Sequence, residues 1–211
     1  MSVLILTPNI DTMSGALTLL PAVLLATIFV FACLLAFRVV FKALWFYEMM
    51  RKVAVKLTLR YYQPLISRPP VLCGVYGGRE VVIDFVDFYV GFTRIEVTRV
   101  RVFHNGTLAQ EFSVGDLPLL KRIGKDAGCR RLGSDDDEFE RRYVVAGGDL
   151  AVIRKYLDAG LRQMILAWNQ PYTVGAFDVS YSRPGRITDV KTLSEALDFL
   201  VKAAARADKI V

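Results

Sequence analysis

Few side chains in this 211-residue sequence could perform chemistry, and their spacing does not favour it. The one histidine, His104, stands beside an Asn-Gly dipeptide, which is typical of a tight turn. This position favours a residue that flanks a turn over a catalytic base. No Ser-His-Asp, Cys-His or multi-histidine constellation is indicated for a single chain.

The cysteines and glycines also favour structural roles. Cys33 lies in an apolar run, while Cys73 and Cys129 are isolated and form no CxxC pair. We expect both to be structural thiols, reduced in a cytoplasmic domain. The glycines at 74, 77 and 78 lack the order and the Lys-Ser/Thr pair of a phosphate loop, so they predict a hairpin turn.

Carboxylates are the remaining candidates. Asp84 and Asp87 lie in one expected strand, and Asp135 to Glu138 form an acidic run. That run could bind a divalent cation through alternate carboxylates, but it lacks the spaced glycine of a calcium loop. We predict a solvated acidic loop and leave cation binding open. We therefore expect no catalytic, cofactor or metal site, and a carboxylate-dependent enzyme is the weakest of the functional hypotheses.

The elements that carry these residues begin with an apolar run without charge, residues 16–37. As a helix it would span roughly 33 Å, enough for a hydrocarbon core of about 30 Å. Pro21 is compatible with the first turn if Thr18 caps the helix. A cleaved signal peptide is disfavoured, because no Lys or Arg precedes the run and the run exceeds a signal core.

The charge distribution predicts the orientation of this span. Only Asp11 precedes it, whereas residues 38–68 carry seven basic residues against Glu48. By the positive-inside rule, residues 1–15 lie outside the cell and the C-terminal domain is cytoplasmic. The formal net charge of +6 thus belongs to the membrane-proximal stretch. It indicates anionic lipid rather than nucleic acid as a partner.

Residues 38–63 have the pattern of a basic amphipathic helix that continues from the span. A polar stripe within about 120° contains Arg38, Lys42, Glu48, Lys52, Lys56 and Arg60. Apart from Arg51, the rest of the circumference is apolar, and we predict that Trp45, Phe46, Met49 and Met50 contact a partner.

Three interpretations of this helix stay open. It could pack on its own domain, lie on the lipid surface, or bind another membrane subunit. So wide an apolar arc would be a liability if nothing covered it, which favours a subunit. The sequence does not identify the partner or the oligomeric state.

A Pro-rich linker, residues 64–70, precedes a domain of residues 71–211, which begins with strands. Residues 71–76 and 80–88 predict a hairpin about Gly77-Gly78. Residues 93–104 alternate as a strand, with Ile95, Val97, Arg99, Arg101 and Phe103 on one face. Asn105-Gly106 predicts a second hairpin that returns along residues 108–114. Asn105-Gly106-Thr107 also fits a glycosylation acceptor, which the cytoplasmic orientation disfavours.

The second half contains the expected helices. Residues 117–123 could form a short helix, and residues 124–137 an exposed loop. Residues 139–145 and 172–181 predict strands. One helix is expected from Asp149, its N-cap, to Trp168, and a final helix over residues 189–207, with Thr192 and Glu195 as a capping box.

The stretch Glu138–Tyr181, EFERRYVVAGGDLAVIRKYLDAGLRQMILAWNQPYTVGAFDVSY, resembles bacterial and archaeal membrane proteins grouped as the domain of unknown function 3137. In these proteins an aromatic and basic strand, a capped helix and a short strand follow an N-terminal membrane segment. Residues 74–83, GVYGGREVVI, are similar to the opening hairpin of such domains. The resemblance covers about half of the chain and implies architecture only.

Together these features predict an α+β protein. A transmembrane helix continues into the basic amphipathic helix, followed by a mixed antiparallel-sheet domain with two C-terminal amphipathic helices. We expect a non-catalytic, single-pass accessory or scaffolding subunit of a membrane complex, such as a bioenergetic or transport complex, without cofactors. The alternative is a peripheral sensor of anionic lipid.

Overall fold

The structure, a computed structural model, describes residues 10–63, 68–90, 92–106, 108–122, 128–133 and 137–210. The chain divides into two compact units, one ending at Phe46 and the other comprising Tyr47–Val211. The expected N-terminal segment, linker and acidic loop lie partly outside the described residues, as does Thr107.

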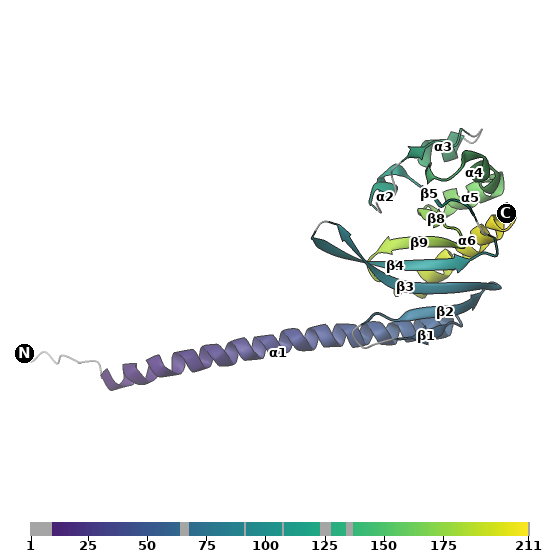
Figure 1. Cartoon of the computed structure of the whole chain (residues 1–211). Coiled ribbons are helices and arrows are strands. Elements are labelled where there is room, and N and C mark those ends of the chain that lie inside the picture. The colour runs from purple at the N-terminus through teal and green to yellow at the C-terminus, as the bar shows by residue number, and fades with distance from the viewer. Residues whose placement is uncertain are drawn as a thin grey trace, which may run out of the picture. The chain divides into compact units, whose positions relative to one another are not determined.

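The first unit is formed by helix α1 (Ile10–Lys56), whose last turns belong to the second unit (Figure 1). The segment Val23–Lys56 is long and apolar enough to cross a membrane, by length and composition. Its large apolar side chains are exposed from Val23 to Trp45. Phe46, the last residue of the unit, is buried. The expected continuation of the apolar run into the basic segment as one helix is confirmed.

The helix ends earlier than the expected residue 63. Thr58 has a φ of 57°, and the N–H of Leu59 donates to the carbonyl of Ala54 at 2.8 Å. The N–H of Thr58 donates to the carbonyl of Val55 at 3.2 Å. These are the two bonds of a Schellman motif, with threonine where glycine is usual. Strand β1 (Arg60–Tyr62) follows, so Arg60 lies on a strand and not on the helical stripe.

The second unit contains one antiparallel sheet, nine-stranded among the described residues, in the order β1-β2-β3-β4-β9-β8-β5-β7-β6. The further strands are β2 (Val71–Tyr76), β3 (Arg79–Val90), β4 (Thr93–Phe103), β5 (Phe112–Gly115), β6 (Cys129–Arg130), β7 (Val144–Gly147), β8 (Tyr172–Val174) and β9 (Asp178–Pro184). The expected β2-β3 hairpin is confirmed, with Gly77 and Gly78 at positive φ in its turn.

The expected hairpin at Asn105-Gly106 is wrong. β4 pairs with β3 and β9, whereas β5 pairs with β7 and β8. The backbone N–H of Asn105 instead donates to Asp208, 2.7 Å away beyond the end of the last helix. A tertiary contact has therefore overridden the local preference for a two-residue turn.

Helices α2 (Leu117–Arg122), α3 (Asp137–Arg142), α4 (Leu150–Tyr156), α5 (Ala159–Trp168) and α6 (Val190–Ala207) complete the second unit. The expected strand over 139–145 is α3 followed by β7. The expected helix from Asp149 to Trp168 is two helices, because Asp158 provides a second N-cap and accepts from the N–H of Leu161. The final helix is confirmed, with Asp189 as its N-cap and its carboxylate bound to Thr192. This cap replaces the expected capping box.

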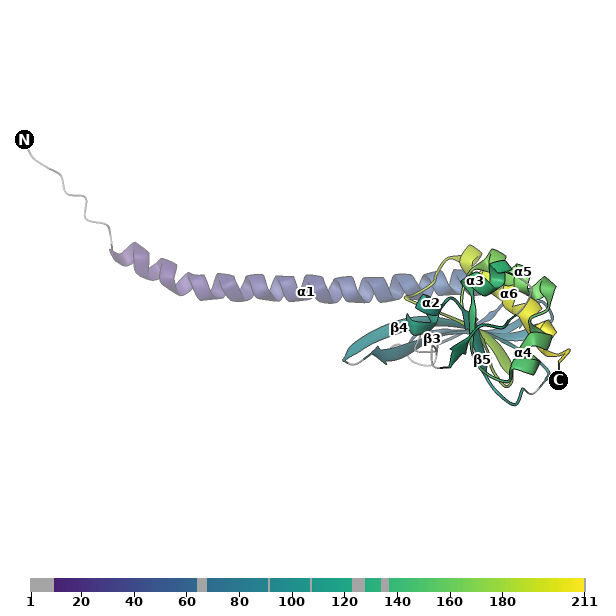
Figure 2. The same cartoon turned by 90° about the horizontal axis from the view of Figure 1, so that it is seen from above.

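The core lies between α6 and one face of the central strands. α6 packs on β4 and β9, where Val100, Val102, Val179 and Tyr181 are buried (Figure 2). On the helix, Leu193, Leu197 and Leu200 are fully buried. Figure 2 shows α5 and α6 on the same side of the sheet. The opposite face of β4 and β9 is therefore not covered by α5 or α6.

Candidate functional site

The predicted partner residues of the first unit differ in exposure. Trp45 is 55% exposed, and Arg38 and Lys42 are also exposed. Phe46 is only 2% exposed. Of the two aromatic residues that were predicted to contact a partner, Trp45 is therefore the accessible one.

The predicted methionines lie in the second unit. Met50 is fully buried together with Val53, and Met49 is half-buried. The prediction that Met50 contacts a partner is therefore corrected, because the side chain forms part of the domain core. The interpretation in which this face of the helix packs on its own domain holds for these turns.

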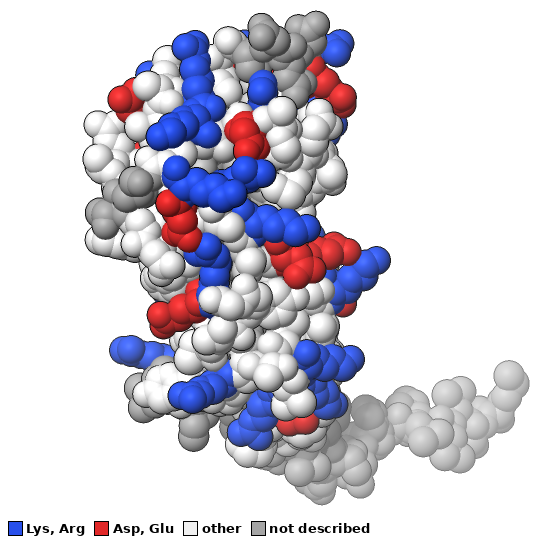
Figure 3. Space-filling view, turned by 90° about the vertical axis from the view of Figure 1, so that its right-hand side faces the viewer, with Lys and Arg blue, Asp and Glu red and all other residues white. Residues whose placement is uncertain are grey.

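The predicted basic residues of the second unit are exposed. Lys52 and Lys56 line a shallow depression of about 290 Å³ with Glu48, Arg51 and Val55. Lys52 approaches Glu48 at 4.0 Å. Arg60 is exposed on β1. On the face seen in Figure 3, blue and red side chains are interspersed, so the described residues there form no extended basic patch.

The candidate carboxylates are held in ion pairs. Asp84 accepts from Nε and Nη2 of Arg99 at 2.9 and 2.6 Å, and from Nη2 of Arg101 at 3.3 Å. Asp87 pairs with Arg94 at 2.8 Å. Of the acidic run, Asp135 and Asp136 lie outside the described residues. The described part of the chain contains no group of three or more side chains suited to holding a metal ion.

His104 and the cysteines are not brought together. His104 is 6% exposed, and its Nε2 lies 3.2 Å from the carbonyl oxygen of Gly175. It is thus a buried residue that joins β4 to the loop before β9, rather than an exposed turn flank. Cys33, Cys73 and Cys129 are free thiols.

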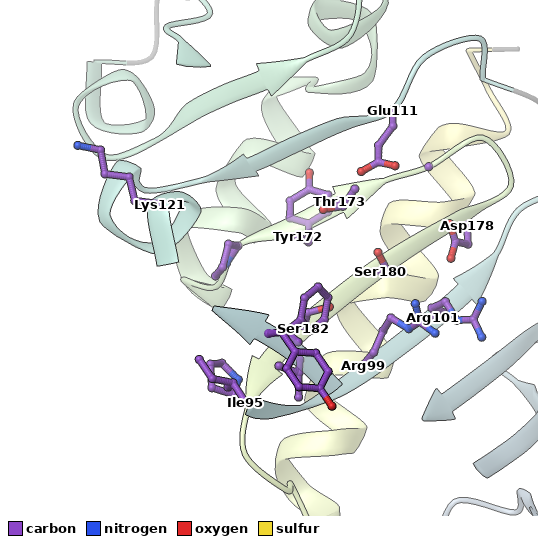
Figure 4. Close-up of a pocket in the computed structure, with 16 residues that line it drawn as sticks. Ile95, Arg99, Arg101, Glu111, Lys121, Tyr172, Thr173, Asp178, Ser180 and Ser182 are labelled. Atoms are coloured by element: carbon purple, nitrogen blue, oxygen red, sulfur yellow. The ribbon is translucent and has the colours of Figure 1, made fainter. Parts of the chain in front are cut away.

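A groove that the sequence did not reveal lies on the face of β4 and β9 opposite α6. Its volume is about 540 Å³, within the approximate 300–1,000 Å³ range of ligand pockets. β4 contributes Ile95, Val97, Arg99 and Arg101, and β9 contributes Asp178, Ser180, Ser182 and Pro184 (Figure 4). Strand alternation places these side chains on one face.

The strand register determines the order of the lining side chains along the groove. Phe88 pairs with Ile95, Arg99 with Ser182, Arg101 with Ser180, and Phe103 with Asp178. From Ile95 to Arg101 the strand rises about 20 Å. Figure 4 shows Ile95 at one end, and Glu111 and Asp178 at the other. Along β4 and β9 the lining therefore changes from Ile95 and Val97, through guanidinium and hydroxyl groups, to Asp178, and Lys121 of α2 adds a further cation to the lining.

At the polar end of the groove, the two arginines and Asp178 differ in how well their charges are compensated. Arg99 and Arg101 share the carboxylate of Asp84, and Nε of Arg101 is buried without a hydrogen-bond partner among the described residues. Burial raises the pKa of Asp178, while Arg101 and Arg99 act against this rise. The groove thus presents an incompletely paired guanidinium beside a carboxyl group whose ionised form is poorly solvated.

The sequence did contain part of the signal for this groove. The alternation of residues 93–104 predicts that Ile95, Val97, Arg99, Arg101 and Phe103 share one face of a strand. What was missing was the neighbouring strand, because β9 is contributed by residues about eighty positions later in the chain.

Comparison with known proteins gives little that bears on function. No family model matches the sequence, and no curated protein matches it. The crystal structure of the mycobacterial trehalose monomycolate transport factor A, TtfA, aligns with a TM-score of 0.47 at 10% identity. The alignment covers 78% of this chain and 93% of that chain. At this level the likeness carries no argument, and the resemblance to the domain of unknown function 3137 stays a prediction.

Proposed function

We propose that this chain is a single-pass, non-catalytic accessory subunit of a membrane protein complex. The supporting observation is the exposed apolar surface of α1 from Val23 to Trp45, in a segment long enough to cross a membrane. Such a surface is unfavourable in water and stable in lipid or against another apolar helix. The α+β domain follows directly in the chain and is thereby held at the membrane.

The partner surface that we propose is narrower than the sequence suggested. Phe41, Leu44 and Trp45 are 59%, 60% and 55% exposed, whereas Met50 is buried. Aromatic residues dominate many binding hot spots. We therefore assign the subunit contact to Phe41, Leu44 and Trp45.

The orientation in this proposal is N-terminus outside and domain in the cytoplasm, as the charge asymmetry favours. In a chain without its natural cysteines, Ser2→Cys should react with an impermeant maleimide in intact cells. Lys202→Cys, on an exposed position of α6, should react only after permeabilisation. The reverse labelling pattern would contradict this topology.

Subunit binding is tested by purification in mild detergent. Leu44→Ser with Trp45→Ser should release co-purifying membrane proteins, while the apolar residues from Val23 to Phe41 keep the chain in the membrane. Lys191→Gln with Lys202→Gln, on exposed positions of α6, provides a control with two substitutions. Unchanged co-purification in the double Ser variant would exclude this contact surface.

Binding of anionic lipid is the alternative function, supported by the exposure of Lys52, Lys56 and Arg60. Changing all three to Gln should then weaken binding to vesicles that contain anionic lipid, by about 1 kcal/mol per charge. In the subunit hypothesis these substitutions leave the complex intact.

A further inference from the structure

We propose that the groove on β4 and β9 binds one zwitterionic phospholipid, with its acyl chain at the Ile95 end and its ammonium group at the Asp178 end. The proposal concerns the second unit by itself and stands whether or not α1 binds another subunit. It rests on the order of chemical groups along the groove, which matches their order in such a lipid.

The apolar end fits a hydrocarbon chain. Phe88 is 50% exposed and Tyr89 70% exposed, and both line the groove with Ile95 and Val97. Phe92, at the turn of the same hairpin, is fully exposed. Burial of this surface against an acyl chain is favourable in proportion to the apolar area that is removed from water. The apolar end of the groove, around Ile95, therefore favours an apolar ligand group over water.

The middle of the groove fits a phosphate. Arg99 and Arg101 both form direct ion pairs with Asp84, and Asp178 interacts electrostatically with both of them. Nε of Arg101 is buried and has no acceptor within the described part of the chain. Ser180 and Ser182 face these arginines from β9 in register. Guanidinium and hydroxyl donors around one point are a suitable arrangement for phosphate oxygens.

The far end fits an ammonium group. Glu111 and Asp178 line it, and Asp178 pairs with Phe103, two residue pairs beyond Arg101 along the strands. A Cβ at Gly175 would lie 2.6 Å from Oδ1 of Asp178, so glycine leaves space for this carboxylate. A bound cation would compensate for the desolvation of Asp178. A lipid with only an anionic headgroup would instead place no positive charge there.

The test uses the full-length protein in detergent micelles with phosphatidylethanolamine that carries a diazirine on its acyl chain. After irradiation and trypsin digestion, adducts should appear on peptides Glu80–Arg94 and Ile95–Arg99, besides any adducts on α1. Absence of adducts from both peptides would overturn the proposal.

Variants distinguish the three parts of the groove. Ser182→Phe should block it without changing a charge and abolish these adducts. Arg101→Gln should lower their yield about tenfold for phosphatidylethanolamine and for phosphatidylglycerol, because both have a phosphate. Asp178→Asn should lower the yield for phosphatidylethanolamine alone, and Glu195→Gln, on the exposed side of α6, should change nothing. Circular dichroism confirms that each variant is folded.

The pattern of results decides the identity of the headgroup. If Asp178→Asn affects both lipids equally or neither, the acidic end does not bind an ammonium group and the proposal is wrong. If adducts persist in Ser182→Phe, the labelled peptides are reached from outside the groove and the proposal is equally wrong.

Discussion

Arg99 and Asp84 face each other on β4 and β3 and form a two-point ion pair, with donor–acceptor distances of 2.9 and 2.6 Å. Arg101 adds a third contact to the same carboxylate at 3.3 Å. Asp84 is 13% exposed at its side chain, so the pair lies largely out of solvent. The carboxylate of Asp84 thus compensates the positive charges of Arg99 and Arg101, which lie on neighbouring positions of one face of β4.

We predict that Asp84→Ala destabilises the protein by about 1.5–3 kcal/mol, because two guanidinium groups lose their acceptor. Thermal and urea unfolding followed by circular dichroism in detergent would measure the loss. Asp87→Ala is the matched control, since its partner Arg94 is 63% exposed at the side chain and such surface pairs contribute little. Equal losses in the two variants would contradict this account.

The ring of Trp168 stacks on Phe199 with centroids 4.0 Å apart, and meets Tyr181 edge-on at 5.0 Å. Trp168 is only half-buried, so its truncation should cost less than a fully buried tryptophan. We expect Trp168→Ala to lose about 2–3 kcal/mol of unfolding free energy. Trp45→Ala, at an exposed position of α1, should leave the unfolding of the second unit unchanged. A larger effect at Trp45 would contradict the stated burial of the two rings.

Elements with strong local signals could be predicted from the sequence. The Gly77-Gly78 turn joins two runs rich in apolar residues, and α6 has apolar residues at helical spacing. These signals act within a few residues, and tertiary structure did not oppose them.

Other elements depended on distant contacts. Phe139 and Tyr143 fit a strand as well as a helix, and α3 is formed because both rings are buried one turn apart, stacked at 5.2 Å. Thr58 ends α1 although threonine rarely adopts a left-handed conformation. The groove itself requires β9 beside β4, which no local pattern encodes.

The boundary of the folded domain leads to a truncation prediction. Met50, Val53 and Leu57 are buried, and β1 covers the edge of β2. A fragment that begins at Tyr47 should therefore unfold cooperatively. A fragment that begins at Val71 loses three buried side chains worth about 1.5–3 kcal/mol each, comparable with the whole stability of a domain.

Calorimetry and urea titration of the two fragments would test this prediction. The shorter fragment should be partly unfolded or aggregated, while the longer one gives a single transition. If the fragment from Val71 matched the stability of the longer one, the last turns of α1 and β1 would not be part of the core.

Asp178 and Asp208 should give stability profiles of opposite sign with pH. Burial raises the pKa of Asp178 above its ordinary value of 3.8 despite the nearby arginines. Burial also acts to raise the pKa of Asp208, but hydrogen bonds from Arg79 and from the N–H of Asn105 outweigh it, and the net pKa is lowered from 3.8. The folded state thus favours the protonated form of Asp178 and the ionised form of Asp208.

The measurement is the unfolding free energy of the wild-type chain minus that of each Asn variant, from pH about 2 to 7. For Asp208→Asn this difference in unfolding free energy should be largest at a pH above the unfolded-state pKa of Asp208. It should fall as the pH drops from the unfolded-state pKa to the lowered folded-state pKa. For Asp178→Asn the difference should be largest at low pH. It should decline as the pH rises from the unfolded-state pKa to the raised folded-state pKa. Parallel profiles would show that the two carboxyl groups do not differ in this way.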